Sequence, residues 1–145
     1  GGSDALEVPL EVPMVVGASV LDTSKTIEYG GDVSAYPTLI RITGPITDCI
    51  ITNNTTDEKL DFTDTTIAAA DYYDIDCRYG SKTVTDKAGD SKISDLTSDS
   101  DLATFHLAAP TDGSASRQNS INVTGSSVTE ATEVELTYNT RFSGI

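Results

Sequence analysis

The chain contains one histidine, His106, the side chain best suited to move protons near neutral pH. A catalytic triad needs a base with complementary partners, and a histidine-based metal motif usually needs more than one histidine. A two-histidine metal site is therefore excluded. His106 stands between Phe105 and Leu107 in a run that alternates as a strand would. We expect it to occupy an outward position on a strand, without a catalytic role.

Acidic residues are numerous enough to raise the possibility of paired catalytic carboxylates. Two carboxylates about 5 to 10 Å apart can hydrolyse a glycosidic bond when burial raises the pKa of one of them. Most acids here fall in turns or on the polar side of alternating runs, as do Asp74, Asp76, Glu133 and Glu135. Their abundance makes any chance pair uninformative. We expect no enzymatic activity and no catalytic residue.

Two loop-like segments, 86–90 (DKAGD) and 95–101 (DLTSDSD), cluster oxygen ligands of the kind that calcium prefers. Neither segment has the spacing of an EF-hand loop. Asp and Ser side chains also cap turns by accepting hydrogen bonds from nearby backbone amides. We therefore predict turn caps in both segments, with no metal site and no cofactor.

Sugar binding would call for an exposed aromatic ring with polar groups beside it. The chain has no Trp, and its weak candidate glycan contacts are Tyr72, Tyr73 and Tyr79. Tyr72 and Tyr73 are adjacent in an alternating run, so they point to opposite faces. One of that pair is expected in the core and the other at the surface.

Charge restricts the classes of partner. Twenty-three acidic residues against nine basic ones give the 145-residue chain a formal charge of -14. That charge repels nucleic-acid phosphates and anionic lipid headgroups, so we expect no nucleic-acid binding. No apolar run approaches the roughly 20 residues that span a bilayer, so we expect no membrane insertion. The acidity fits either simple solubility or a surface for a basic partner or divalent cations.

Cys49 and Cys77 are too few for a disulfide scaffold, and both lie in strand-like runs. A cysteine in such a run commonly acts as a small buried apolar residue. We expect free thiols, although a bridge remains open if the two strands are neighbours.

The fold class follows from turn signals that recur at short intervals after Val12, where Gly, Asn and Asp break the chain into runs of period two. Clear examples are residues 39–42, 73–77 and 134–138, in which apolar residues alternate with charged or hydroxylated ones. Residues 1–11 mix Gly, Ser, Pro and acids, and are expected to form a flexible lead-in or linker. We predict an all-β domain over 12–145.

Two hairpins are expected. Residues 49–52 and 59–62 flank a polar turn at 53–58, and residues 72–79 and 82–85 flank Gly80-Ser81, which fits a two-residue type II′ turn. Only Lys92 to Ala103 allows a short turn of helix. About ten to twelve strands in one domain indicate an antiparallel two-sheet β-sandwich.

Several segments, in order, resemble a known family: the C-terminal domain of the distal tail proteins of siphophage tail tips. They are residues 26–53 (TIEYGGDVSAYPTLIRITGPITDCIITN), 67–71 (IAAAD), 79–84 (YGSKTV), 91–105 (SKISDLTSDSDLATF) and 138–145 (YNTRFSGI). The resemblance covers almost everything after Val12. It implies a galectin-like or carbohydrate-module-like jelly roll in which Tyr36-Pro37 and residues 42–45 are framework.

The resemblance also implies a role and a location. It implies a structural component of a phage or prophage tail, located in the virion and assembled in the bacterial host cytoplasm. Its expected partners are other tail proteins, with a hexamer when an upstream belt domain is joined to this one. Almost nothing precedes Val12 here, which departs from the family's arrangement, whereas the ending at 141–145 matches its natural C-terminus. The alternative is a carbohydrate-binding module that recognises host-surface glycans.

Overall fold

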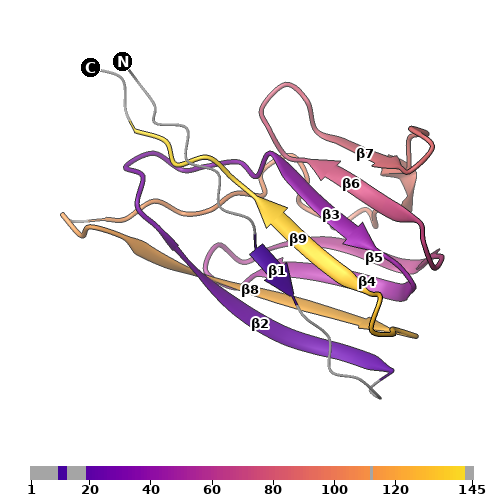
Figure 1. Cartoon of the computed structure of the whole chain (residues 1–145). Coiled ribbons are helices and arrows are strands. Elements are labelled where there is room, and N and C mark those ends of the chain that lie inside the picture. Colours follow the sequence, from indigo (N-terminus) through magenta and orange to yellow (C-terminus); the bar gives the residue numbers. More distant parts are fainter. Residues whose placement is uncertain (1–9, 13–18, 112, 143–145) are drawn as a thin grey trace.

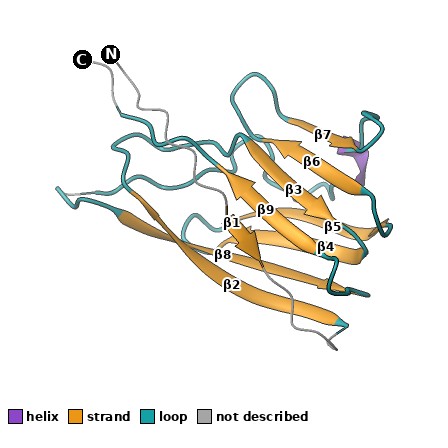
Figure 2. Cartoon of the chain, viewed as in Figure 1, coloured by secondary structure: helices purple, strands orange, loops and turns teal. Residues whose placement is uncertain are grey.

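The protein is an all-β sandwich in the computed structural model, which describes residues 10–12, 19–111 and 113–142 (Figures 1 and 2). The strands are β1 (Leu10–Val12), β2 (Val20–Tyr29), β3 (Leu39–Thr43), β4 (Ile46–Asn53), β5 (Glu58–Ile67), β6 (Tyr72–Asp76), β7 (Thr83–Asp86), β8 (Arg117–Ser126) and β9 (Glu133–Thr137). A short 3₁₀ turn, η1 (Ile93–Asp95), is the helical element of the described residues. No helix in this part of the chain is long and apolar enough to cross a membrane.

Two sheets form the layers of the sandwich. One has the strand order β1-β9-β3-β6-β7 and the other β2-β8-β4-β5, and every strand pair is antiparallel. The predicted two-sheet β-sandwich is confirmed. The described residues form nine strands rather than ten to twelve, because the run around His106 crosses the end of the sandwich as a loop with one isolated bridge, Ala35 to Leu107.

The period-two runs form strands because their apolar side chains meet between the sheets. In β3, β6 and β9 every second residue is buried. Ile40, Ile75 and Leu136 from one sheet share a continuous core with Leu60 and Val123 from the other. Burying such side chains contributes about 1.5–3 kcal/mol each, which is the main term that holds the sheets together.

Aromatic residues add two edge-to-face contacts to this core. The Tyr29 and Tyr138 ring centroids are 5.9 Å apart, and those of Phe62 and Tyr73 are 5.7 Å apart. The Tyr29 hydroxyl also donates to the Val33 carbonyl and accepts from the Arg141 amide. Tyr29 therefore fixes the segment near Arg141 against the start of the β2–β3 connection.

Both predicted hairpins form, but only the first has the predicted turn. Cys49 pairs with Phe62 and Asn53 with Glu58, so the first hairpin closes through residues 54–57. In the second, β6 ends at Asp76 and β7 begins at Thr83, so the two-residue type II′ turn was wrong. The Asp76 carboxylate accepts from the Arg78 amide and the Arg78 carbonyl from the Ser81 amide, which stabilises a wider turn.

At Gly44 the chain passes from one sheet to the other between β3 and β4. A Cβ there would collide with the backbone carbonyl oxygens of Ile67 and Ala68. The Gly44 amide donates to the Asp71 carbonyl at 3.0 Å. The corner therefore requires glycine because two backbones approach closely, not because of an unusual φ angle.

A loop covers the outer edge of β5. The Thr97 amide donates to the Asp61 carbonyl, and the Asp101 amide donates to the Lys59 carbonyl. In return, the Lys59 amide donates to the Asp101 carboxylate and the Asp61 amide to the Ser100 hydroxyl, both at 2.9 Å. Residues 97–101 thus satisfy backbone groups of β5 that an edge strand would otherwise leave unpaired.

The predicted linker over residues 1–11 overlaps the described residues only at its end. Leu10–Val12 pairs with β9, so the five-stranded sheet already includes residues 10 and 11. Residues 1–9 of that prediction, and residues 143–145 of the predicted C-terminal match, lie outside the described residues.

Candidate functional site

The three tyrosines proposed as glycan contacts lie in different environments. Tyr72 is half-buried on the outer face of the five-stranded sheet, whereas Tyr73 is buried and its hydroxyl donates to the Asp95 carboxylate at 2.6 Å. Tyr79 is 90% exposed in the β6–β7 connection. The predicted split of Tyr72 and Tyr73 between surface and core is confirmed. A buried ring cannot stack on a sugar, so Tyr73 was wrong as a candidate contact.

Arg41 lies at the centre of that outer face. Its guanidinium makes two hydrogen bonds to the Asp74 carboxylate, at 2.7 and 2.8 Å. The same group lies over the Tyr72 ring, 3.9 Å from the centroid. The antiparallel register makes this possible, because Arg41 is opposite Asp74 on one side and Glu135 on the other. One face of Tyr72 is therefore already occupied by a cation.

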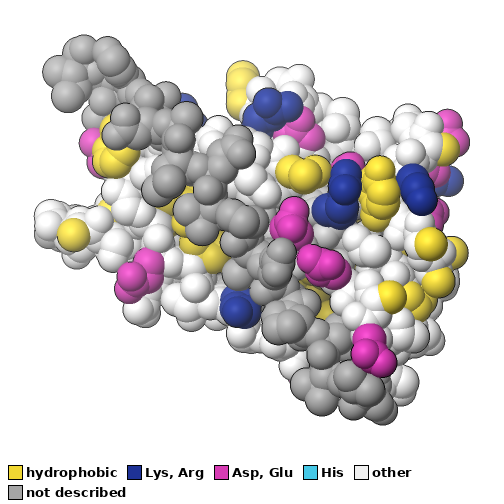
Figure 3. Space-filling model, viewed as in Figure 1, with side chains coloured by type: hydrophobic (Ala, Val, Ile, Leu, Met, Phe, Trp, Pro, Cys, Tyr) yellow, Lys and Arg dark blue, Asp and Glu magenta, His cyan; other side chains and the backbone are white. Residues whose placement is uncertain are grey.

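A polar hollow of about 250 Å³ opens beside this group, lined by Arg41, Thr43, Glu133 and Glu135. Figure 3 shows acidic and basic side chains next to each other over β9, β3 and β6. Asp74 and Glu135 are half-buried on the outer face and Glu133 is exposed there, as predicted for acids on the polar side of their strands. The described residues that line the hollow offer hydrogen-bonding groups of both charges, and none of them is aromatic.

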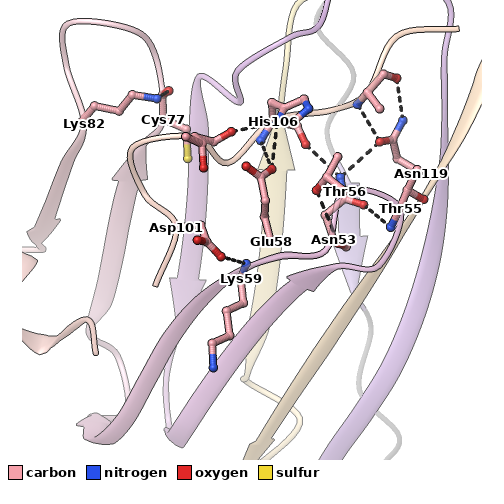
Figure 4. A network of polar contacts seen from close by, with 12 residues as sticks. Asn53, Thr55, Thr56, Glu58, Lys59, Cys77, Lys82, Asp101, His106 and Asn119 are labelled. Carbon is pink, nitrogen blue, oxygen red and sulfur yellow. Dashed lines mark hydrogen bonds and ion pairs between the residues drawn. The ribbon is translucent and has the colours of Figure 1, made fainter. Parts of the chain in front are cut away.

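His106 lies in the 101–109 loop rather than on a strand, so the predicted strand position was wrong. Its Nδ1 is 2.8 Å from a Glu58 carboxylate oxygen and 2.8 Å from the Thr104 carbonyl oxygen (Figure 4). Both neighbours accept hydrogen bonds, so Nδ1 carries the proton. The Glu58 carboxylate also accepts from the His106 backbone amide at 3.1 Å.

The Glu58–His106 pair holds a loop in place. Glu58 is only 8% exposed and comes from the first residue of β5. The Tyr36 ring lies beside the imidazole, with centroids 6.4 Å apart, and the Lys82 ammonium lies 4.2 Å from the Tyr36 centroid. Within the described residues, the hydrogen-bond partners of His106 are the Glu58 carboxylate, the Thr104 carbonyl and the Asn53 side-chain amide, and no hydroxyl or thiol is among them.

Two fully buried asparagines complete this network (Figure 4). The Asn119 side-chain oxygen accepts from the Ala108 amide at 2.8 Å, and its nitrogen donates to the Ala108 carbonyl at 3.1 Å. The Asn53 side-chain nitrogen donates to the His106 carbonyl and to the Asn119 side-chain oxygen. These bonds replace the ladder partners that the 105–109 segment lacks. The sequence pattern placed Asn53 and Glu58 in the polar turn at 53–58 without predicting their burial, and it did not single out Asn119.

The predicted turn cap is confirmed in the 86–90 segment, whereas the 95–101 segment caps a neighbouring strand instead of its own turn. The Asp86 carboxylate accepts from the Ala88 and Asp90 amides at 3.0 and 2.9 Å. Asp101 caps the β5 edge as described above, and the Asp99 carboxylate accepts from the Thr97 hydroxyl at 2.6 Å. Among the described residues, no group of histidine, cysteine and acidic side chains has the arrangement of a metal site.

Both cysteines are free and buried, so no bridge joins them. Burial raises the pKa of each thiol, Cys49 and Cys77, to about 12. A buried thiol with so high a pKa is a poor nucleophile, because the thiolate is the reactive form.

Comparisons with protein-family models, with curated proteins and with solved structures found no match to this chain. A functional proposal for this chain therefore rests on its fold, its contacts and the resemblance of its sequence segments.

Proposed function

We propose that this chain is a structural, non-enzymatic β-sandwich domain of a phage or prophage tail, a distal tail or tail-tip component that works through protein–protein contacts in virion assembly and host attachment. The observation that carries the proposal is the set of contacts made by polar side chains that could otherwise take part in catalysis or binding. Glu58, His106 and Asn119 bind backbone groups of one loop instead of converging on a cavity. The resemblance of the segments between 26 and 145 to distal tail proteins supplies the class of particle.

The proposal specifies partners and a location. The partners are other tail proteins, and the chain forms a homo-oligomer, a hexamer in the family it resembles, when it is joined to an upstream belt domain. The domain then resides in the virion and is assembled in the bacterial host cytoplasm. It uses no cofactor, binds no nucleic acid and does not insert into a membrane.

Labelling of intact particles tests this proposal. An antibody raised against the isolated chain is bound to purified virions and its position is recorded by electron microscopy. The label should lie at the distal end of the tail, and particles from a strain that lacks the coding sequence serve as the control. A structural role is refuted if the strain that lacks the coding sequence makes normal particles and the particles of the parent strain never carry the label.

A carbohydrate-binding module recognising host-surface glycans is the second candidate, favoured by the polar hollow next to Tyr72. Arg41 both lines the hollow and stacks on that ring. A glycan array with the whole chain tests this alternative. Saturable binding that is lost in Tyr72→Ala and kept in Tyr79→Ala would place a sugar at the hollow, whereas the absence of binding to any glycan leaves the scaffold role.

A further inference from the structure

The two edges of the four-stranded sheet differ in their backbone contacts. The sheet has β5 at one edge and β2 at the other. Backbone groups of β5 are bonded to the loop at 97–101, as described above. β2 is a strand of 10 residues with β8 on one side, and Figure 1 shows its other side at the lower margin of the molecule. The two edges therefore differ in what they leave for another chain to bind.

The strand register identifies the residues of β2 whose backbone groups face the free side. The Asn54 amide donates to the Ser120 carbonyl, so Ser120 directs its backbone groups toward β4. Neighbouring residues of a strand direct these groups to opposite sides, so Ile121 faces β2, where it is paired with Lys25. Lys25 in turn faces β8, and the residue before it, Ser24, faces away from β8.

Every second residue of β2 therefore carries an amide and a carbonyl on the free side: Val20, Asp22, Ser24, Thr26 and Glu28. All of them are exposed, and no hydrogen bond joins these backbone groups to another residue in the part of the chain that the structure describes. A row of unpaired backbone groups is a template for another strand. We propose that β2 pairs in antiparallel orientation with β2 of a second copy, which joins the four-stranded sheets of the two copies.

The sequence of β2 is complementary to itself in a two-fold contact. An isologous interface presents the same patch from both copies, so the strand must accept its own residues in reverse order. A register centred on Ser24 pairs Ser24 with Ser24, Asp22 with Thr26 and Val20 with Glu28 of the second copy. All of these residues direct their backbone groups to the free side, so each pair exchanges two hydrogen bonds.

Lys25 selects this register. It lies in the inward-facing row of β2 but is exposed, and an inward-pointing lysine on an edge strand opposes strand addition in general. A register centred on Lys25 would set the two lysines against each other and Asp22 against Glu28, and like charges directly opposite are destabilising. The register centred on Ser24 places Thr23 of the second copy opposite Lys25 and opposes no like charges.

The pairing stops at two copies. Once the β2 strands are joined, the outermost strands of the combined sheet are the β5 strands of both copies. Their edges are bonded to the loop at 97–101, so they do not recruit a further strand. A two-fold contact of this kind is closed. The pairing is independent of the virion role.

Sedimentation equilibrium of the whole chain, from micromolar to millimolar concentration, tests the proposal. The average mass should rise from that of the 15.3 kDa chain toward twice that value and stop there. Thr26→Pro removes an amide from the free side, where an edge strand tolerates proline, and should weaken association by about tenfold or more because a hydrogen bond is lost from both symmetry-related pairs. Thr26→Ala keeps the amide and should associate within about twofold of the unmodified chain. A chain that stays monomeric, a mass that passes the dimer, or equal effects of the two variants overturns the proposal.

Amide hydrogen exchange of the unmodified chain, followed by NMR at low and high concentration, provides a test that does not depend on variant folding. In dilute solution the amides of Asp22, Ser24 and Thr26 should exchange fast, whereas those of Thr23 and Lys25, which face β8, should exchange slowly. At high concentration the first three should become protected. Fast exchange at both concentrations overturns the proposal. Protection that is already present in dilute solution overturns it too, because the edge would then be occupied by the chain itself.

Discussion

Asn119 is expected to be one of the most important single side chains for stability. It is fully buried and satisfies both backbone groups of Ala108, and its oxygen also accepts from Asn53. Asn119→Ala removes these bonds and leaves the amide and the carbonyl of Ala108 without partners, whereas the Asn53 side-chain nitrogen keeps its bond to the His106 carbonyl. Each such group costs about 1–3 kcal/mol, and partial entry of water offsets some of this cost, so we expect a loss of about 4 kcal/mol in the free energy of unfolding.

Asn122 provides the matched control. It lies on the same strand, β8, three residues further on, but it is half-exposed on the outer face and contacts Ser24. Asn122→Ala therefore makes the same chemical change at a site that water can reach, and should cost less than about 1 kcal/mol. Because both substitutions lie in one strand, the change in intrinsic strand preference nearly cancels.

The measurement is equilibrium unfolding in urea, followed by circular dichroism, for the unmodified chain and both variants. The slope against urea concentration should stay constant, so that differences in midpoint report stability alone. Small domains are stable by only about 5–15 kcal/mol, so a loss of about 4 kcal/mol is easily resolved. If Asn119→Ala costs no more than Asn122→Ala, the argument that the 105–109 segment depends on this side chain is refuted.

Three further outcomes follow from the contacts. Asp74→Ala breaks the Arg41–Asp74 pair and should lower the free energy of unfolding by only about 0.5–1 kcal/mol, and by less at high salt, because both side chains are partly exposed. A double-mutant cycle with Arg41→Ala measures the coupling energy of the pair. A coupling energy above about 2 kcal/mol that does not depend on salt would contradict the description of this pair as a surface ion pair. Burial raises the pKa of Asp61, but hydrogen bonds from the Thr63 hydroxyl and amide and from Lys59 outweigh this and set the pKa below its ordinary value of 3.8. The resulting stability is present above that value and is lost as pH falls through the lower pKa of the folded state. The difference in free energy of unfolding between the unmodified chain and Asp61→Asn should therefore shrink in acid. A difference that grows in acid would show that folding raises the pKa of Asp61 instead of lowering it. Cys49 and Cys77 should not react with a thiol reagent in the folded chain at pH 8 and should both react in urea, and fast labelling of the native protein would show that one of them is accessible.

Much of the fold could be predicted from local pattern. The alternation in residues 39–42, 73–77 and 134–138 identified strands and their inward faces, because a strand that is half-buried repeats every second residue. The polar turn at 53–58 was also predicted, since Asn and Asp accept left-handed backbone; Asp57 has a φ of 60°. These features depend on neighbours in the sequence.

The network around His106 could not be predicted in the same way. Asn53, Asn119 and Glu58 are polar residues whose burial depends on a loop distant in sequence that needs hydrogen-bond partners. Nothing in their immediate sequence distinguishes them from surface residues such as Asn54 or Asn122. The position of Arg41 between Asp74 and Glu135 could likewise be predicted only from the strand order, which brings together segments more than thirty residues apart.

The loop at 97–101 has a consequence for how the molecule behaves when crowded. By occupying alternate amides and carbonyls of β5, it acts as a built-in substitute for a neighbouring strand. On the other sheet, the Lys92 backbone amide donates to the Val84 carbonyl of the edge strand β7 in the same way. Strands from other copies are thereby kept from adding repeatedly to the edges of β5 and β7 to form a fibre. Many copies can therefore be concentrated in one place without aggregating through these two edges.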